Sequence, residues 1–225
     1  MNMKVEYFDN NLRLTNDYIN IIEITNKNYF YRFVKDLYLI SKSQFSETIS
    51  FFDDENKEIN VNGKIRVYLD FFDFNFDSKK YSNDINKYVN DSISEIDKNV
   101  LITQYNKIIK IYNKILNDID LPLSITNEIN IENISKMFKI SMDIKQELLD
   151  NILLLIDVER ALKTNNTLFF INLKQYLNKN ELLELYKYAI YNEVKIVLID
   201  SQNYGTTLDY EKKLILVSEI FLFYL

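Results

Sequence analysis

The sequence predicts an α/β protein whose core lies near the C-terminus. Two short apolar runs, Leu168–Leu173 and Lys195–Asp200, are rich in Ile, Val and Phe and have the composition of buried parallel strands. Between them, apolar side chains recur at helical spacing over 182–190. Asn178, followed three residues later by Glu181, has the pattern of a capping box that starts this helix. A strand, a helix and a strand in this order predict a βαβ crossover.

The other elements are predicted from apolar periodicity and from turn residues. Short strands are expected over 3–8, 12–15 and 18–24, and further strand-like segments over 47–52 and 214–225. Helices are expected over 29–38, 101–119, 131–138 and 143–163. The scarcity of glycine (2) and proline (1) favours long regular elements with few tight turns.

The middle of the chain predicts a helical insertion into the α/β part. Leu101, Tyr105, Ile108, Tyr112, Ile115 and Ile119 step by three and four residues, a seam that favours packing against a partner helix. The pattern stops before Pro122, which cannot continue a helix. We therefore expect a head domain made of residues 1–78 and 161–225, with an antiparallel helical leg over 79–160 inserted between its two parts.

The composition excludes several kinds of chemistry. The 225 residues include no cysteine and no histidine, which excludes disulfides, Ser-His-Asp triads and zinc sites of the usual N/S kind. The net charge of −6 gives no general attraction to nucleic acid, so a basic surface must be local. No apolar run reaches the roughly 18–20 residues of a membrane span, and no signal peptide is apparent. We expect a cytoplasmic protein without a membrane partner.

A strand–turn–helix near the N-terminus occupies the place of a phosphate-binding loop in nucleotide-binding domains. The turn reads ITNKNYF and has no glycine and no GK[ST], so its backbone amides cannot close around phosphates. Asp200 and Asn172 stand at the ends of the two core strands, where α/β proteins place functional residues, and Asn172 stands where an ATPase often carries an acid. Without a phosphate loop to complete the site, catalysis is not expected.

Two further patterns each have a functional and a structural interpretation. Asp118 and Asp120, with the carbonyl of Ile119 between them, are spaced to meet one hard cation at a helix end, although a solvated acidic turn is the more common outcome. Lysines repeat along the long helix on a face away from its apolar seam. Such a row is usually a solvated helix face, but it can also be a stripe that contacts phosphates. These lysines are Lys107, Lys110 and Lys114.

The order of motifs resembles one family, the ring-forming, DNA-end-binding proteins of type II-A CRISPR spacer acquisition. The motifs are an initial strand pair, IIEITNKNYFYRFVKDLY without a phosphate loop, FFDDENK at 51–57 and LDFFDFNFDS at 69–78. The helical insertion follows, and then LFFIN and YLNKNEL within 168–182. The likeness spans nearly the whole chain, although no single motif is diagnostic.

The resemblance implies a protein with an ATPase-like head and a helical leg that is not an enzyme. Members of the family form homotetrameric rings, bind linear double-stranded DNA through a lysine-lined hole, bind calcium, and work with the adaptation integrase complex and the type II effector nuclease. Lys57 in FFDDENK and Lys179 in YLNKNEL match basic positions of the family. Asp118 and Asp120 match its calcium-associated segment, but Pro122 and Ile125 stand where further acids are expected.

The function expected from sequence is therefore sequence-independent binding of DNA ends during spacer acquisition. Two alternatives stay open. One is a divergent nucleotide-binding ATPase-like protein, against which the missing glycine loop counts. The other is a scaffold that associates through its helical leg, without nucleic acid.

Overall fold

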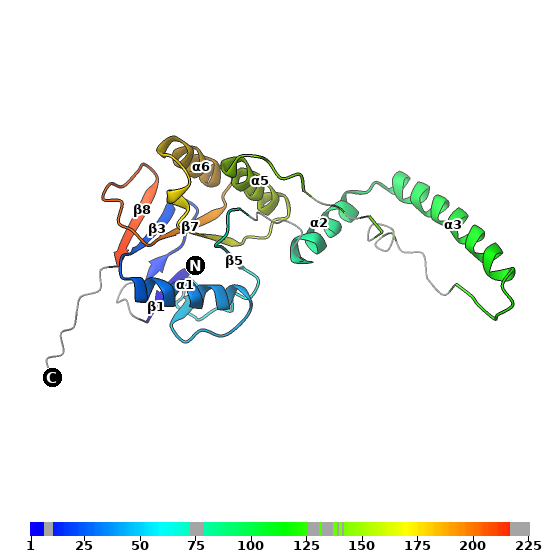
Figure 1. The fold of residues 1–225 in the computed structure, drawn as a ribbon, viewed down its shortest axis with the longest axis horizontal. Helices are drawn as coiled ribbons and strands as arrows, with labels where there is room; N and C mark the ends of the chain where they lie inside the picture. The colour runs from blue at the N-terminus through cyan, green and yellow to red at the C-terminus, as the bar shows by residue number, and fades with distance from the viewer. Residues whose placement is uncertain are drawn as a thin grey trace. The chain divides into compact units, whose positions relative to one another are not determined.

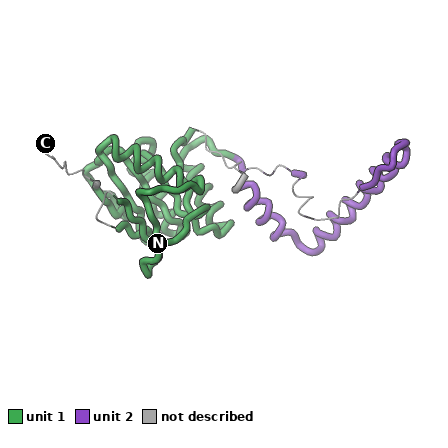
Figure 2. Tube along the Cα trace, turned by 90° about the horizontal axis from the view of Figure 1, so that it is seen from below, with its two compact units in different colours: residues 1–74, 144–225 green, residues 75–143 purple. Residues whose placement is uncertain are grey.

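The computed structural model describes residues 1–6, 11–72, 79–125, 131, 137–138, 140 and 142–216. The chain divides into two compact units. Unit 1 consists of Met1–Phe74 and Ile144–Leu225, and unit 2 of Asn75–Asp143 (Figure 2).

Unit 1 is built on a parallel sheet of five strands, in the order β5-β6-β7-β3-β8 (Figure 1). The strands are β3 (Ile19–Ile24), β5 (Ile65–Tyr68), β6 (Thr167–Ile171), β7 (Lys195–Asp200) and β8 (Glu211–Leu216). All their pairings are parallel. The three central strands are almost wholly buried, which explains their continuous apolar runs, because both faces of a parallel sheet are covered. The predicted α/β class with a parallel core sheet is confirmed.

One face of this sheet is covered by helix α1 (Lys27–Ser41) and by a smaller antiparallel sheet, β2-β1-β4. The strands of the smaller sheet are β1 (Asn2–Val5), β2 (Leu12–Arg13) and β4 (Ile49–Phe52). Side chains from α1, from the smaller sheet and from β3, β6 and β7 form one hydrophobic cluster. The first two predicted N-terminal strands therefore pair in the smaller sheet, whereas the third enters the main one.

The opposite face carries α5 (Leu148–Ala161) and α6 (Lys179–Tyr191), which lie side by side (Figure 1). A short 3₁₀ helix, η1 (Leu173–Gln175), joins β6 to α6. The predicted capping box is present, since Asn178 accepts from the N–H of Glu181 while the Glu181 carboxylate accepts from the N–H of Asn178. The predicted β6–α6–β7 unit thus forms with the expected helix start.

Unit 2 contains α2 (Lys79–Ser92) and α3 (Glu95–Asn117). Ser94 caps α3 by accepting from the N–H of Asp97, so α2 and α3 are separate helices. Helix α3 has no buried residue along its 23 positions. Across the part of the chain that the structure describes, no helix combines the length and the apolar character needed to cross a membrane.

The predicted leg differs from unit 2 at its second boundary. Helix α5 belongs to unit 1, whereas the sequence assigned residues up to 160 to the leg. The reason lies in its side chains: Ile152, Leu155 and Ile156 are completely buried, so α5 is a core helix of unit 1. Most of the predicted 131–138 helix, and residues 217–225 of the predicted last strand, lie outside the described residues.

A buried carboxylate joins α5 to the sheet. Glu159 forms an ion pair with Arg66 of β5, at 2.9 Å between Oε1 and Nε. Its other oxygen accepts hydrogen bonds from the side-chain amide of Asn166 (2.8 Å) and from the hydroxyl of Thr164. The side chain of Glu159 is 2% exposed and that of Arg66 is 11% exposed, so solvent screens this pair little.

Removing this carboxylate will destabilise unit 1. Glu159→Ala removes the buried ion pair to Arg66 and the oxygen that accepts from Thr164 and Asn166. We expect a loss of about 3–5 kcal/mol in the free energy of unfolding, measured by chemical denaturation. Glu184→Ala, on the exposed face of α6, is the control and should change stability by less than about 0.5 kcal/mol. Equal effects of the two variants would contradict the role given to the pair.

Candidate functional site

The carboxyl ends of β6 and β7 meet at Asn172 and Ser201. Asn172 has a left-handed backbone with φ of 57°. Its side-chain Oδ1 accepts from the N–H (2.9 Å) and the hydroxyl (3.0 Å) of Ser201. The side-chain oxygen at the position where an ATPase often carries an acid therefore joins two loops instead of facing a ligand.

Beside this junction lies a buried cluster of charges. Glu23 of β3 and Asp200 of β7 are register partners on neighbouring strands, and both are 0% exposed. Lys213 of β8 forms an ion pair with Glu23, at 2.7 Å between Nζ and Oε1. The backbone N–H of Tyr204 also donates to that oxygen, at 3.3 Å.

A second ion pair completes the cluster. Lys174 of η1 meets Glu211 of β8 at 2.6 Å, and both side chains are buried. The hydroxyl of Tyr186, from α6, donates to the same carboxylate at 2.8 Å. The ammonium of Lys174 also lies over the ring of Tyr204, 5.4 Å from its centroid. Five segments of unit 1 are thus joined through charged side chains.

Burial shifts the ionisation of this cluster. Loss of hydration raises the pKa of Asp200 to about 7; Lys174 opposes the shift, and Glu23 and Glu211 add to it. Burial also raises the pKa of Tyr204 to about 12, with Asp200 and Glu23 adding to the shift. Burial and the neighbouring Glu211 raise the pKa of Tyr186 far above its ordinary range, so its hydroxyl stays protonated and donates.

In the turn from β3 to α1, the side chain of Asn26 accepts hydrogen bonds from the first backbone N–H groups of the helix. The Oδ1 of Asn26 accepts from the N–H groups of Asn28 (3.0 Å) and Tyr29 (3.2 Å) at the start of α1. These are amides that a phosphate loop would direct at a ligand. The two glycines of the chain, Gly63 and Gly205, lie elsewhere in the sequence. This geometry agrees with the absence of a phosphate loop in the sequence.

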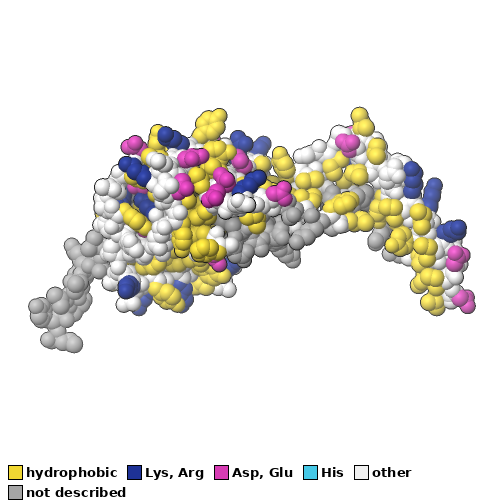
Figure 3. All heavy atoms as spheres, turned by 45° about the horizontal axis from the view of Figure 1, so that its top comes forward, with side chains coloured by type: hydrophobic (Ala, Val, Ile, Leu, Met, Phe, Trp, Pro, Cys, Tyr) yellow, Lys and Arg dark blue, Asp and Glu magenta, His cyan; other side chains and the backbone are white. Residues whose placement is uncertain are grey.

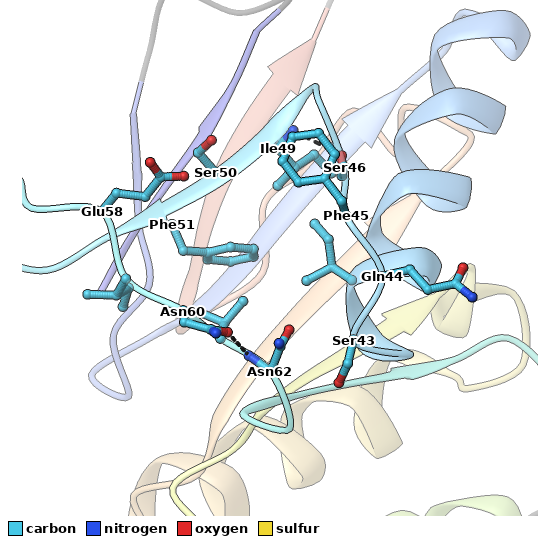
Figure 4. A pocket seen from close by; sticks show the side chains of 13 residues that line it. Ser43, Gln44, Phe45, Ser46, Ile49, Ser50, Phe51, Glu58, Asn60 and Asn62 are labelled. Atoms are coloured by element: carbon cyan, nitrogen blue, oxygen red, sulfur yellow. Dashed lines mark hydrogen bonds between the residues drawn. The ribbon is translucent and has the colours of Figure 1, made fainter.

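A pocket of about 510 Å³ opens between the end of α1, β4 and the segment 58–62 (Figure 4). Its polar lining consists of hydroxyl and amide side chains with one charged residue, Glu58. Asn60 and Asn62 form one rim, where Oδ1 of Asn60 accepts from the N–H of Asn62 at 2.8 Å. A lining whose charge is negative does not suit a nucleotide phosphate.

Lys57 lies on the turn that follows β4. The Oδ1 of Asp53 organises this turn, accepting from the N–H groups of Glu55 (3.0 Å) and Lys57 (2.8 Å), and Asn56 has φ of 61°. The Lys57 side chain is exposed. Because these hydrogen bonds fix the backbone of the turn, the Lys57 side chain extends into solvent from a defined position.

Lys179 is the first residue of α6, directly after the cap Asn178, and it is exposed. The other three predicted contacts, Lys107, Lys110 and Lys114, lie on α3 and are exposed as well. Their spacing of three and four residues places them on one face of α3, over about 10 Å of its length. Figure 3 shows Lys and Arg side chains one after another along part of unit 2. Lys57 and Lys179 belong to unit 1 and the three α3 lysines to unit 2.

The predicted metal segment follows the end of α3. Asp118 is the C-cap of the helix, and Asp118, Ile119 and Asp120 are all exposed. The carbonyl of Ile119, predicted as a ligand, accepts from the N–H of Leu121 at 2.8 Å. Calcium takes about six to eight oxygen ligands, and the described residues contain no group of three or more acids that could hold a metal ion. Two exposed carboxylates do not form a complete site, so calcium here stays a prediction of the resemblance.

Sequence reasoning identified Asp200 and Asn172 but missed their charged neighbours. The missed residues are Glu23, Lys174, Glu211 and Lys213. A signal was present for Glu23, an acid within a run made otherwise of isoleucines and one asparagine, which forms β3 and is buried at every position. Its partner lies 190 residues further along the chain, and neither strand alone predicts the pairing.

The fold and these surfaces define a class: α/β proteins with a parallel five-stranded sheet, no glycine-rich phosphate loop and a separate helical unit. A family model described as CRISPR-associated protein (Cas_Csn2) matches residues 42–217, more than three quarters of the chain. The chain therefore belongs to the Cas_Csn2 family of CRISPR-associated proteins, and the resemblance stated from sequence is confirmed at this level.

A solved structure has the same fold. It is Stu0660 of Streptococcus thermophilus, with a TM-score of 0.67 and 12% sequence identity, over 96% of this chain and 74% of that one. At this identity the likeness concerns the fold. A comparison with curated protein sequences found no match.

Proposed function

We propose that this protein binds the ends of linear double-stranded DNA during CRISPR spacer acquisition, as a homotetrameric ring that performs no chemistry of its own. The observation that carries the proposal is the family match over 42–217, which includes residues of both units and all five candidate lysines. The family implies a role in CRISPR adaptation. Its implied partners are the adaptation integrase complex and the type II effector nuclease.

The charge distribution supports binding at a local surface. The subunit carries a net charge of −6, so the average field repels DNA. Rotational symmetry repeats each lysine around a ring, so a few exposed lysines per subunit can make a hole positive while the outside stays acidic. Contacts from such lysines reach phosphates and read no base edge, which gives binding without sequence preference.

The apolar seam of α3 supports self-association. Ile108, Tyr112 and Ile115 of α3, and Ile119 just after its end, are each at least 41% exposed. The sequence predicted that this seam packs against a partner helix. The other long helix assigned to the leg, now α5, belongs to the core of unit 1. A further copy of the chain is the partner that would cover the seam in an oligomer.

The first prediction from the proposed function concerns the oligomeric state. Because the exposed seam of α3 can be covered by a further copy of the chain, and because the family resemblance implies a four-membered ring, we expect a homotetramer at micromolar concentration. The measurement is light scattering coupled to size exclusion, which should give about four times the subunit mass of 27.0 kDa. A monomer at that concentration would contradict the proposed ring and the proposed binding of DNA through its central hole.

The second prediction concerns Lys57. Lys57→Glu reverses one charge at every symmetry-related position, so we expect binding of blunt linear duplex to weaken by about tenfold or more. The log–log slope of affinity against salt should become shallower by roughly 0.9 per lost phosphate contact. The loss should be uniform across DNA sequences, because these contacts read no bases. Fluorescence anisotropy over a salt series measures all three effects.

Lys187→Glu is the matched control, because Lys187 is an exposed lysine of α6 outside the proposed set. The same change in net charge should then alter affinity much less. Equal losses in both variants would mean that net charge alone weakens binding, and that Lys57 has no special contact.

The third prediction concerns access to DNA. A closed ring must be threaded, so a free end is required. In competition against a labelled duplex, linearised plasmid should compete far better than the same plasmid in relaxed closed-circular form, at one salt concentration. Equal competition would reject threading while leaving non-specific phosphate binding in place.

A further inference from the structure

Asp200 and Glu23 are two buried carboxyl groups on adjacent strands. They are register partners of β7 and β3, and each is 0% exposed. Within the described part of the chain, neither oxygen of the Asp200 carboxyl group has a hydrogen-bond partner, and neither does Oε2 of Glu23. Buried polar atoms without partners are rare and costly, so these three oxygens need an explanation.

The charges around them do not balance. Three carboxylates, those of Glu23, Asp200 and Glu211, share the cluster with two ammonium groups. Lys213 pairs with Glu23 and Lys174 pairs with Glu211, which leaves Asp200 without a counter-charge. The other groups that face Asp200 are two tyrosine hydroxyls, from α6 and from the loop after β7, and these are neutral at ordinary pH. An unpaired carboxylate at this depth is strongly disfavoured.

We propose that Asp200 and Glu23 share a proton, and that this proton keeps the edge strand β8 attached to the sheet. One proton on Asp200 removes the surplus charge. It also provides an O–H donor that Oε2 of Glu23 can accept, so a single proton satisfies two of the unpartnered groups at once. The Glu23 carboxylate keeps its ion pair with Lys213 through its other oxygen, Oε1.

Strand β8 depends on this balance because its links to the cluster are ionic. Among the strands of the described residues it lies at the edge of the sheet and pairs with β3 alone. Two of its side chains, Glu211 and Lys213, form the ion pairs to Lys174 and Glu23. A charged Asp200 attracts both lysines and thus competes with Glu211 and Glu23 for them. Loss of the proton therefore weakens the two pairs that hold β8.

The sign of the pH effect follows from linkage. Burial raises the pKa of Asp200 from its ordinary value of 3.8 to about 7 in the folded protein. A group whose folded pKa lies above its unfolded pKa contributes stability that is complete below the unfolded value, about 4. That contribution is lost as the pH rises through the folded value, about 7. Strand β8 should thus be held most firmly in mild acid and loosen above neutral pH.

The test is the pH dependence of thermal stability in the full chain, for wild type and Asp200→Asn. Asparagine is neutral at every pH and its amide can donate to Glu23, so the variant imitates the protonated state. We expect its Tm to equal that of wild type near pH 5 and to exceed it by about 3 °C or more at pH 8. Asp209→Asn, at an exposed position of the neighbouring loop, is the control and should give a difference that does not change with pH.

A measurement on the wild type covers the case in which the variant does not fold. Carbon-13 NMR of protein labelled at the aspartate carboxyl carbon should show one aspartate that titrates with a midpoint near pH 7. Hydrogen exchange of the 211–216 amides, corrected for the intrinsic effect of pH, should accelerate between pH 6 and about pH 8. If every aspartate titrates below about pH 5, or if the Tm difference is the same at pH 5 and pH 8, the shared proton is rejected. Corrected exchange at 211–216 that is independent of pH would reject the link to β8.

Discussion

The structure of unit 1 depends on one constraint, that both faces of a parallel sheet must be covered. β3, β6 and β7 bury nearly every side chain, and a strand of this kind is stable only between two layers. One layer consists of α1 and the small β2-β1-β4 sheet, and the other of α5 and α6. The same constraint removes α5 from the leg, because without α5 much of one sheet face would be exposed.

The elements that were predicted correctly are those whose sequence signals lie within the element itself or directly beside it. The β6–α6–β7 unit is specified by two apolar runs and a capping box within 35 residues. The assignment of α5 failed for a physical reason. An apolar stripe with helical period says that a helix is buried, but it does not say which surface buries it. Helix α3 shows the converse, with a regular seam and no buried residue.

The candidate site divides in the same way. Lys57 and Lys179 were found because short motifs contain them, and both lie on local structures, a turn organised by Asp53 and a capped helix start. The buried charge cluster could not be predicted from sequence, because its ion pairs join residues far apart in the chain. In the sequence, Lys213 is one of the polar residues at the start of β8, and nothing near it indicates a buried partner. The parallel pairing of β8 with β3 brings it to Glu23.

The cluster also occupies the place where sheets of this kind usually bind a ligand. The carboxyl ends of parallel strands are where α/β proteins usually bind ligands, since loops there leave a crevice. Here the side-chain amide of Asn172 joins two loops and Asn26 caps α1, while Glu23 and Asp200 lie buried beneath the loop after β7. Polar groups that would face a ligand instead satisfy one another. The exposed candidate lysines lie elsewhere, on the β4 turn and the start of α6 in unit 1 and along α3 in unit 2. In the proposed function these lysines contact a long polyanion, DNA, which binds along a surface and does not need a pocket.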